Sequence, residues 1–384
     1  MKILMSNYEF PPIGGGAGRA NLNLLENLAD NDDVAVDLVT SAPQPGTTVE
    51  QFARNITIHR TGVHKKDLHF WRRCEIAEWL VRADNLYRRL MRQNRYDLAH
   101  AFFSLPTGWL PYRSRKTMPY IVSLRGSDVP GHNVRFGLEY TVLSPLFRRI
   151  WNSAAMLVAN SKGLAESARA FAGDLPVEVI CNGVDCARFS PGEQQKPTGP
   201  VRLLTVSRLS STKRIDLLVD AVAILRKSGV DVRLDIAGQG KLLDELKKTA
   251  ARAGLAEHVN FMGRVASDDI PQLYRDSRIF VMSSTREGMS NAMLEAMASG
   301  LPVVTTRCQG VEELIDDNGI VVEDFDAGKI AAAIRRLVDD ENMYEQMRIA
   351  ARKRAQTFGW RQVADQYIEC YRNVLGGKSA RAGA

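Results

Sequence analysis

The sequence contains no run of eighteen apolar residues, the length that a helix needs to cross a bilayer. Its start, MKILMSNYEFPP, has only a short apolar run before Asn7 and Glu9, so we interpret it as a first strand and not as a secretory signal. The five cysteines are scattered, and only Cys181 and Cys186 lie close together, with a spacing that matches no common zinc pattern. We therefore expect free thiols in a reducing cytoplasm.

Several motifs of catalysis and cofactor binding are also absent. The first glycine loop does not match G-x-G-x-x-G, because Gly14 and Gly16 fit but Arg19 occupies the third glycine position. The chain has no G-x-x-x-x-G-K-[ST] loop, no G-x-S-x-G elbow and no His/Cys cluster with metal-ligand spacing. None of the standard nucleic-acid motifs is present. We expect no bound metal, no cofactor and no nucleic-acid partner, and a dinucleotide-dependent oxidoreductase is disfavoured.

Length and composition indicate a globular protein of two domains. The chain has 384 residues, of which 45% are hydrophobic and 25% charged. The formal charge of +7 is unevenly spread, since residues 60–95 hold ten Lys and Arg against four acidic residues. Such a basic region attracts nucleic acid, anionic membranes or phosphorylated ligands.

Short apolar runs alternate with helical patterns along the whole chain, which predicts an α/β fold with parallel sheets. We predict two Rossmann-like domains, residues 1–185 and 186–359, because a polar segment rich in Gly, Gln, Pro and Lys separates the two alternations. Residues 43–55 are interpreted as a loop. A last helix is predicted over 360–375, and the tail 376–384 is expected to be disordered.

One stretch, residues 278–306, has the pattern strand, loop, helix, strand. It places Glu287 in the loop and Glu295 on the helix, at the carboxyl end of a parallel strand, where open α/β sheets bind ligands. In the alternative interpretation, Glu287 only complements the helix dipole and Glu295 is solvated. Spacing alone does not decide between the two.

Two cations follow the first strand of the second domain. Arg208 and Lys213 flank the start of a helix, at the same end of the predicted sheet as Glu287. Arginine makes bidentate contacts with phosphate oxygens, and lysine adds a compact charge. The pair suits a diphosphate that must leave with negative charge. Ordinary surface charge is the alternative, but the shared sheet end favours function.

In the first domain, the glycine loop occupies the position where many α/β proteins bind phosphate, although a flexible turn is the alternative. Arg125 and Asp128 follow a predicted strand and lie at a carboxyl sheet end. The predicted helix 70–93 alternates arginines with apolar residues, including Trp71 and Trp79. It is interpreted either as a membrane-surface helix or as an ordinary charged surface, and both remain open.

Taken together, these segments resemble a known family. E-G-M-S-N-A-M-L-E, at residues 287–295, resembles the E-x7-E motif of retaining glycosyltransferases of family 4, the "glycosyltransferase group 1" enzymes with the GT-B fold. Further segments that resemble the family, in chain order, are P-P-I-G-G-G-A (11–17), H-A-F-F-S-L-P-T-G (100–108), S-L-R-G-S-D-V (123–129), N-G-V-D (182–185), S-R-L-S-S-T-K-R-I-D (207–216), I-A-G-Q-G (236–240) and F-M-G-R-V (261–265). The resemblance covers nearly the whole chain.

The resemblance implies two Rossmann-like domains that face a central cleft, with the helix 360–375 joined to the first domain. It also implies a metal-independent, hexosyltransferase-type enzyme whose nucleotide diphosphate-sugar is a co-substrate. In such an enzyme, Arg208, Lys213 and Glu287 are the catalytic residues, and the two cations stabilise the departing diphosphate. The donor-binding residues implied are Gly15, Gly16, Arg264, Val265, Gly288, Met289, Ser290, Asn291 and Glu295. Glu295 would bind the ribose, and the backbone amides of 288–291 would hold the sugar together with Glu287.

One departure from the family concerns the strand predicted over 120–124. Many members carry a histidine near its end, and here Arg125 stands in its place. The role of that histidine is not transferred, and Arg125 and Asp128 are candidates for positioning the acceptor only.

The resemblance implies cell-surface polysaccharide or glycolipid assembly with a glycan or lipid-linked acceptor, and the basic, tryptophan-containing first domain suggests a lipid-linked or phosphorylated acceptor. The protein is expected in the cytoplasm, with residues 60–95 as a candidate contact to the anionic inner face of the membrane. Two rival interpretations are a GT-B nucleotide-sugar epimerase and a non-catalytic nucleotide-sugar-binding protein.

Overall fold

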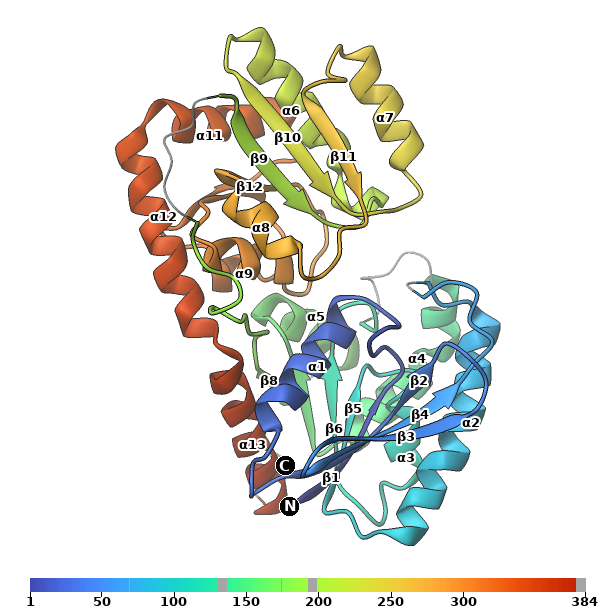
Figure 1. Ribbon diagram of the computed structural model, residues 1–384. Coiled ribbons are helices and arrows are strands. Elements are labelled where there is room, and N and C mark those ends of the chain that lie inside the picture. Colours follow the sequence, from blue (N-terminus) through green and yellow to red (C-terminus); the bar gives the residue numbers. More distant parts are fainter. Residues whose placement is uncertain (69, 130–136, 174, 193–198, 378–384) are drawn as a thin grey trace. The chain divides into compact units, whose positions relative to one another are not determined.

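The computed structural model of the protein describes residues 1–68, 70–129, 137–173, 175–192 and 199–377 (Figure 1). The chain divides into two compact units. Unit 1 comprises Met1–Asn182 and Trp360–Ala384, and unit 2 comprises Gly183–Gly359. The division lies three residues before the boundary expected between 185 and 186. From residue 378 onward, the tail expected to be disordered lies outside the described residues.

Unit 1 is built on an eight-stranded sheet with the order β3-β4-β2-β1-β5-β6-β7-β8. All neighbours pair in parallel except β3 and β4, which are antiparallel. The strands are β1 Lys2–Asn7, β2 Ala35–Ala42, β3 Thr47–Ala53, β4 Ile56–Gly62, β5 Leu98–Phe102, β6 Tyr120–Leu124, β7 Met156–Ala159 and β8 Val177–Val179. The prediction of a loop over residues 43–55 was wrong, because this segment contains the edge strand β3. Its first five residues are exposed, so it lacks the alternating apolar face that predicts a strand.

Helices cover both faces of this sheet. They are α1 Gly16–Leu28, α2 Arg73–Gln93, α3 Trp109–Arg113, α4 Gly137–Ser153, α5 Lys162–Ala172 and α13 Trp360–Leu375. Alternate residues of one strand enter different cores, as the period of two requires. Leu4 packs with residues of α2 to α5, whereas Ile3 and Met5 pack with α1 and α13. The last helix, α13, therefore completes the core of unit 1 although it follows unit 2 in the sequence.

Unit 2 contains a six-stranded parallel sheet with the order β11-β10-β9-β12-β13-β14. The strands are β9 Val201–Val206, β10 Val232–Ala237, β11 Val259–Gly263, β12 Ile279–Met282, β13 Val303–Thr306 and β14 Gly319–Val322. The helices are α6 Ile215–Lys227, α7 Leu243–Arg252, α8 Ile270–Arg275, α9 Asn291–Ala298, α10 Val311–Leu314, α11 Ala327–Asp339 and α12 Glu341–Ala355, with a 3-10 turn at Ser211–Lys213. Short apolar runs such as Ile279–Met282 are buried along their whole length, as expected for strands covered on both faces.

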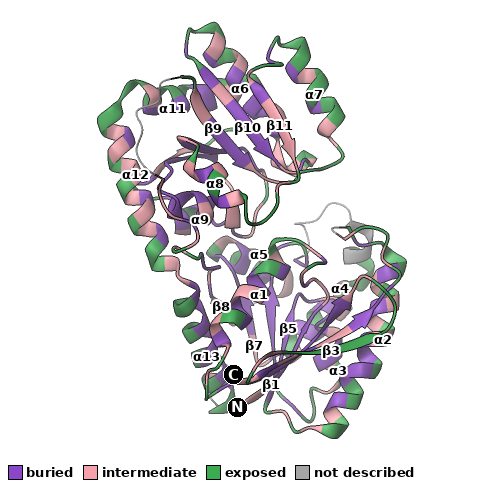
Figure 2. Cartoon of the chain, viewed as in Figure 1, coloured by how far each residue is buried: buried purple, intermediate pink, exposed green. Residues whose placement is uncertain are grey.

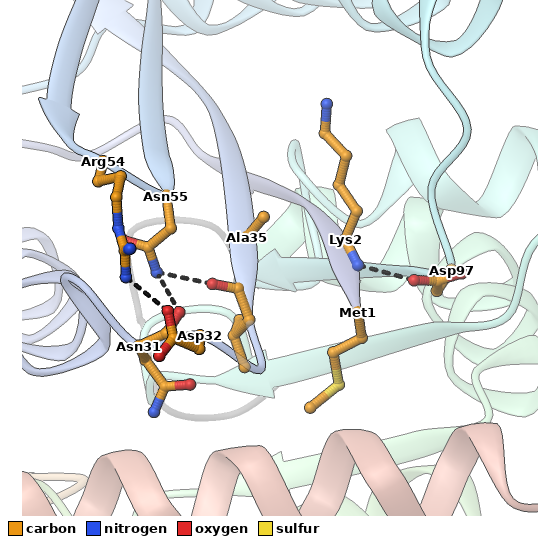
Figure 3. Close-up of a pocket in the computed structure, with 9 residues that line it drawn as sticks. Met1, Lys2, Asn31, Asp32, Ala35, Arg54, Asn55 and Asp97 are labelled. Atoms are coloured by element: carbon orange, nitrogen blue, oxygen red, sulfur yellow. Dashed lines mark hydrogen bonds and ion pairs between the residues drawn. The ribbon is translucent and has the colours of Figure 1, made fainter.

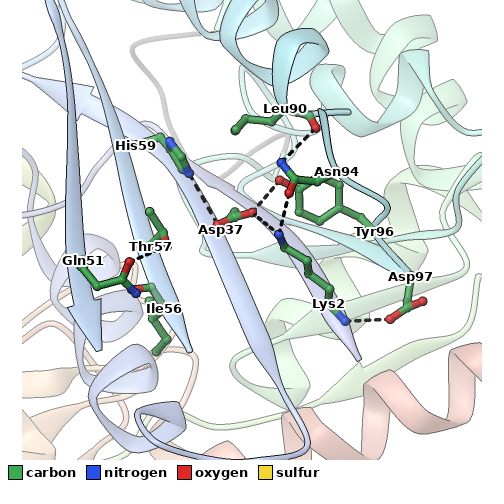
Figure 4. Close-up of polar contacts among 10 residues, drawn as sticks. All are labelled: Lys2, Asp37, Gln51, Ile56, Thr57, His59, Leu90, Asn94, Tyr96 and Asp97. Atoms are coloured by element: carbon green, nitrogen blue, oxygen red, sulfur yellow. Dashed lines mark hydrogen bonds and ion pairs between the residues drawn. The ribbon is translucent and has the colours of Figure 1, made fainter. Parts of the chain in front are cut away.

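A charged cluster lies within unit 1, around Asp37 of β2 (Figure 4). Its carboxylate accepts a hydrogen bond from Tyr96 Oη at 2.6 Å and lies 3.0 Å from Lys2 Nζ and 3.5 Å from His59 Nε2. Burial opposes ionisation of this carboxyl group. The contacts with His59, Tyr96 and Lys2 outweigh that effect and lower the pKa of Asp37 to about 2. The charged form of Asp37 is therefore part of the folded state.

The helix α2 buries the tryptophans that suggested a membrane-surface element. Trp79 is fully buried and Trp71, just before the helix, is 5% exposed. Tyr8 packs edge-on against Trp71, and Lys65 Nζ lies 3.9 Å from its ring centroid. The tryptophans belong to the core of unit 1, and the exposed face of α2 carries arginines (Figure 2). In the described part of the chain, no helix has both the length and the apolar character needed to cross a membrane.

Candidate active site

The strand order of unit 2 reverses between β9 and β12. From β9 the chain proceeds outward to β10 and β11, and from β12 it proceeds in the opposite direction to β13 and β14. At such a point the loops that follow the two central strands diverge, which is where open α/β sheets bind ligands. Lys213 follows β9 and Glu287 follows β12, so both predicted residues lie at this switch point.

Lys213 and Glu287 form an ion pair, with Lys213 Nζ donating to Glu287 Oε1. Their side chains are only 16% and 14% exposed, so the pair is largely shielded from water. Residues 74 positions apart are thus joined at the reversal of strand order. The structure brings together one predicted cation and one predicted carboxylate, which the sequence placed only at the same sheet end.

Hydrogen bonds fix the two loops that carry this pair. Ser283 Oγ donates to the carbonyl oxygens of Lys213 and Arg214, at 2.9 and 2.7 Å. The backbone N–H of Thr285 donates to the carbonyl of Thr212 at 2.9 Å. These bonds restrict the backbone on both sides of the pair, so the position of Lys213 relative to Glu287 is set before any ligand arrives.

The loop from Glu287 to Asn291 is supported by a glycine that sequence reasoning missed. Gly310 has a φ of +80°, and a Cβ at this position would lie 2.7 Å from the carbonyl oxygen of Gly288. A side chain would therefore displace the backbone around Gly288 and Met289. Ser290 then caps α9, with its Oγ accepting from Met293 N–H at 3.2 Å. The backbone of the predicted sugar-binding segment is thus held from two sides.

The other donor-side candidates lie along the same carboxyl edge of the sheet. Arg208 is exposed, two residues after β9. Glu295 lies on α9, where Tyr274 Oη donates to its Oε2 at 2.9 Å. Arg264 and Val265 follow β11, the outer strand of the sheet. Tyr274 was not among the residues predicted from the sequence, because nothing in the spacing links it to Glu295.

Cys308 lies near the ion pair, but its thiol is unreactive at neutral pH. Burial raises the pKa of its thiol to about 12, and the negative charge of Glu287 adds to this effect while Lys213 opposes it. A thiol with such a pKa stays protonated at neutral pH and is a poor nucleophile. In the residues described, no group of three or more His, Cys, Asp or Glu side chains is arranged to hold a metal ion.

The glycine loop of unit 1 contains glycines of different kinds. Gly14 has a φ of +100°, and a Cβ there would lie 2.7 Å from Glu9 Cβ. A Cβ on Gly18 would lie 2.9 Å from the carbonyl oxygen of Glu9. Gly15 differs, because a Cβ at this position would meet no atom within 4 Å, and Gly16 begins α1. Internal packing explains Gly14 and Gly18 but gives no reason for a glycine at 15.

Asp128, predicted on the acceptor side, is buried within unit 1. Its Oδ2 accepts from the backbone N–H of Ser104 at 2.8 Å, and its Oδ1 accepts from the backbone N–H of Arg125 at 2.8 Å. Burial raises its pKa, although these hydrogen bonds act in the opposite direction. Both carboxylate oxygens therefore hold the loops that follow β5 and β6.

The guanidinium of Arg125 contacts both chain segments that form unit 1. It donates to Asn182 Oδ1 at 2.9 Å and to Tyr367 Oη of α13 at 3.3 Å, and it lies 4.5 Å from the centroid of the Phe102 ring. His100 of β5 is fully buried, with Nδ1 2.8 Å from the hydroxyl of Tyr371. Burial, with the positive charge of Arg125, lowers the pKa of His100 to about 3, so this ring is neutral.

A hollow at the amino edge of the sheet in unit 1 is lined by polar groups that already have partners (Figure 3). Asn55 Nδ2 donates to the carbonyls of Leu28 and Val34 at 2.8 and 2.6 Å, and the backbone N–H of Lys2 donates to Asp97 Oδ2 at 2.7 Å. This hollow lies at the opposite end of the strands from the glycine loop. Its contacts stabilise strand starts and contribute nothing to the candidate site.

Two family models match the chain. The model "Glycosyltransferase Family 4" matches residues 14–188, and "Glycosyl transferases group 1" matches residues 188–354. Together they span nearly the whole chain. The chain belongs to this glycosyltransferase family. Its two units correspond to the two matched regions, with α13 added to unit 1.

Known proteins similar to this glycosyltransferase support the assignment and the fold. The glycogen synthase of Mycobacterium tuberculosis is 26% identical over 402 residues, which cover 97% of this chain and 94% of the relative. The structure of sucrose-phosphate synthase from Thermosynechococcus elongatus superposes with a TM-score of 0.84 at 20% identity, covering 98% and 99% of the two chains. Anabaena HepE in complex with UDP-glucose gives a TM-score of 0.72 at 20% identity, covering 96% and 99%. The fold of the glycosyltransferase is GT-B, with two Rossmann-like units.

Proposed function

We propose that this glycosyltransferase moves a sugar from a nucleotide diphosphate-sugar to an acceptor hydroxyl, with retention of the anomeric configuration. The observation that carries the proposal is the Lys213–Glu287 ion pair at the switch point of unit 2, with Arg208 after the same strand as Lys213. The proposal assigns the cation of this pair to the donor phosphate and its carboxylate to the sugar hydroxyls. The complex of HepE with UDP-glucose supports a donor of this class, because HepE has the same fold.

In this proposal Arg208 and Lys213 bind the donor diphosphate and stabilise it as it leaves. The bond between the anomeric carbon and the diphosphate oxygen breaks, and its electron pair stays on that oxygen. The acceptor oxygen attacks the same face of the sugar, and its proton passes to an oxygen of the leaving phosphate. Loss of one preorganised donor of this kind typically costs roughly 3–4 kcal/mol of transition-state stabilisation. The two cations neutralise the leaving group, so the proposed reaction requires no metal.

Lys213 also has a role in the absence of the donor. Without a ligand it neutralises Glu287, so that neither charge is left unpaired in a shielded site. A donor diphosphate then brings new negative charge to Lys213, while the sugar hydroxyls offer hydrogen bonds to Glu287. Binding therefore exchanges one set of charge contacts for another and leaves no buried charge alone.

The remaining residues assigned to the sugar donor lie near the carboxyl edges of the two sheets. We propose that the backbone amides of Gly288, Met289, Ser290 and Asn291 hold the sugar with Glu287. Glu295 binds the ribose hydroxyls, and Arg264 and Val265 lie near the base. From unit 1, Gly15 and Gly16 approach the diphosphate, which accounts for the glycine at 15 that internal packing leaves unexplained. Acceptor positioning by Arg125 and Asp128 stays a prediction, and their internal contacts favour a supporting role.

On the acceptor side, we propose a glycan or lipid-linked molecule in the assembly of cell-surface polysaccharide or glycolipid. The protein would act in the cytoplasm and bind the inner face of the membrane through residues 60–95. The exposed face of this region carries Arg72, Arg73, Arg88, Arg89 and Arg92. Each basic residue near an anionic surface contributes about 1 kcal/mol to the free energy of membrane binding, so electrostatic attraction alone is sufficient for this contact.

Vesicle sedimentation at low salt tests the membrane contact. We expect binding to vesicles of anionic lipid and release as the salt concentration rises, because the attraction is electrostatic. Replacement of Arg88, Arg89 and Arg92 by serine should weaken binding to these vesicles. Failure to bind anionic vesicles, together with efficient use of a water-soluble acceptor, would remove the membrane from the proposal.

A thermal-shift screen with nucleoside diphosphates and their sugars tests the donor. A ligand at 100 times its Kd adds about 2.7 kcal/mol to the stability of the folded state, which is readily measured. The stabilising donor is then incubated with candidate acceptors, and the anomeric configuration of the product is read by NMR. We expect a glycoside with the α-configuration of the donor. A free epimerised sugar, inversion, or stabilisation by none of the diphosphates would each contradict the proposal.

A further inference from the structure

The hydroxyl of Tyr274 contacts the carboxylate to which the proposed function assigns the ribose. Tyr274 lies near the end of α8 and is fully buried. Its Oη is 2.9 Å from Glu295 Oε2 and 3.2 Å from the carbonyl oxygen of Ala292. The carboxylate oxygen is closer than the carbonyl oxygen and is charged, so it accepts the stronger hydrogen bond from the single hydroxyl proton of Tyr274.

Aromatic contacts fix the direction of the Tyr274 ring. Phe189 meets it edge-on, with centroids 5.8 Å apart and an angle of 83° between the planes. Phe280 of β12 lies on another side, with a centroid distance of 6.1 Å. A buried ring held between two others has little rotational freedom. The hydroxyl of Tyr274 is therefore aimed at α9 by the packing of unit 2.

The support for Phe189 reaches α12. Arg352 on that helix donates to the carbonyl oxygen of Phe189 at 2.8 Å, to that of Cys186 at 2.9 Å and to that of Ala298 at 2.5 Å. Ala298 is the last residue of α9, the helix that carries Glu295. One guanidinium thus holds both the segment behind the Tyr274 ring and the helix in front of its hydroxyl.

The protonation state of the Tyr274 hydroxyl determines which group donates this hydrogen bond. Burial, together with the negative charge of Glu295, raises the pKa of Tyr274 well above 10. The phenol therefore keeps its proton at every physiological pH and acts as the donor. A carboxylate oxygen has lone pairs for more than one hydrogen bond, so a bond from Tyr274 orients Glu295 without preventing it from accepting others.

We propose that Tyr274 is a positioning residue that orients Glu295 toward the ribose and so sets the preference for a ribonucleotide over a 2′-deoxyribonucleotide. This inference rests on the role of Glu295 in the proposed function. A glutamate has three rotatable side-chain bonds, and the hydrogen bond selects the rotamer in which the carboxylate meets the sugar. The preference for the hydroxyl-bearing ribose follows from that orientation, because a carboxylate aimed at an absent hydroxyl gains nothing.

The test is the ratio of two dissociation constants, measured by calorimetry. The probes are the nucleoside diphosphate that stabilises the protein most and its 2′-deoxy counterpart. Tyr274→Phe removes one oxygen and leaves the ring packing intact. We expect the preference for the ribonucleotide to fall about tenfold, equivalent to about 1.4 kcal/mol, with little change in the Kd of the deoxynucleotide. A merely structural tyrosine would weaken both ligands together.

Two further variants separate this role from loss of packing. Tyr344→Phe alters another buried tyrosine of unit 2, on α12, and should leave the ratio unchanged. 4-Aminophenylalanine at position 274 keeps an N–H donor in place of the O–H and should retain the preference. If Tyr274→Phe does not fold, the same contact is tested with unnatural amino acids at position 274. The preference should be retained with 4-aminophenylalanine and lost with 4-fluorophenylalanine.

Glu295→Ala, which removes the acceptor oxygens, distinguishes failure of the inference from failure of the proposed function. If Glu295→Ala leaves the preference intact, Glu295 does not bind the ribose, and that part of the proposed function is wrong. If Glu295→Ala abolishes the preference but Tyr274→Phe retains it, the positioning role of Tyr274 is wrong. If both reduce it, the double variant should lose no more than Glu295→Ala alone, because the two residues act through one contact.

Discussion

The two sheets of this glycosyltransferase end in polar residues at their carboxyl edges, but they use them differently. In unit 2, Lys213 and Glu287 pair with each other at the switch point, and Arg208 is exposed nearby in the chain. In unit 1, Arg125 and Asp128 follow β6 and are engaged with neighbouring loops, Asn182 and α13. A position at the carboxyl edge therefore does not by itself make a ligand site.

The difference has a cause in the topology. Unit 1 must accommodate α13, which arrives from the far end of the chain and buries two tyrosines against the sheet. Tyr371 and Tyr367 bring hydroxyl groups into a core where each needs a partner, and His100, Ser123 and Arg125 supply them. Unit 2 is one continuous segment, Gly183–Gly359, and at its edge the side chains of Lys213 and Glu287 pair with each other. We expect substitutions at the edge of unit 2 to reduce activity, and those in unit 1 to reduce stability.

The largest effect is expected at the cations of unit 2. Lys213→Ala or Arg208→Ala should reduce the rate of transfer by about 10²–10³-fold, because each removes about 3–4 kcal/mol of stabilisation from the leaving diphosphate. The melting temperature should stay near that of the wild type in Arg208→Ala, but Lys213→Ala should lower it, because Glu287 is then left without its partner in a shielded site. Lys248→Ala, an exposed lysine of α7, is the control. Steady-state kinetics with the identified donor measures the effect, and near-normal turnover in both variants would overturn the assignment.

In unit 1, Asp128→Ala should reduce stability by about 3 kcal/mol. The buried backbone N–H of Ser104 and the partly buried one of Arg125 would lose their acceptor, and an unsatisfied buried donor costs about 1–3 kcal/mol. Urea unfolding followed by tryptophan fluorescence reports on this unit alone, because Trp71, Trp79, Trp109, Trp151 and Trp360 all belong to it.

The same variant also tests the acceptor-side prediction. Nucleotide affinity, which is assigned to unit 2, should be unchanged in Asp128→Ala. If stability were unaffected while KM for the acceptor rose, Asp128 would bind the acceptor and the contrast between the two edges would be lost.

A smaller and pH-dependent effect is expected at Asp37, in the interior of unit 1. Its pKa is about 2 in the folded protein against an ordinary 3.8, which corresponds to about 2 kcal/mol of stability. This contribution is complete above pH 3.8 and disappears as the pH falls toward 2. Asp37→Asn should therefore lower the unfolding free energy of unit 1 at neutral pH, and the gap to the wild type should close in acid. A gap that is independent of pH would show that the charge is not responsible.

The smallest effect is expected at the glycine loop, where two adjacent glycines should behave oppositely. Gly15→Ala should keep the melting temperature but raise KM for the donor about tenfold, because the added methyl group occupies space that the fold leaves open. Gly14→Ala should lower the melting temperature, since it combines a φ of +100° with a contact to Glu9. Equal donor affinity in Gly15→Ala and the wild type would remove this loop from the donor site.

The sequence by itself determined the local elements and the family. The apolar run at 279–282, the capping residue Ser290 and the glycine that ends the helix at 300 are sufficient to predict strand, loop and helix around Glu287. These signals act over a few residues, so they are readable without a fold. Strand β3 escaped prediction for the same reason, because its exposed side chains leave no periodic pattern.

Only the tertiary structure decided which side chains meet. The pair Lys213–Glu287, the contact of Tyr274 with Glu295 and that of Arg125 with Tyr367 join residues 74, 21 and 242 positions apart. No local signal encodes such contacts, since they depend on strand order and on how loops pack. The same holds for Trp71 and Trp79, for which the sequence left a membrane-surface helix and an ordinary charged surface open, and which lie in the core of unit 1. Residue type and spacing propose the chemistry, and the packing of distant segments decides which groups remain available for it.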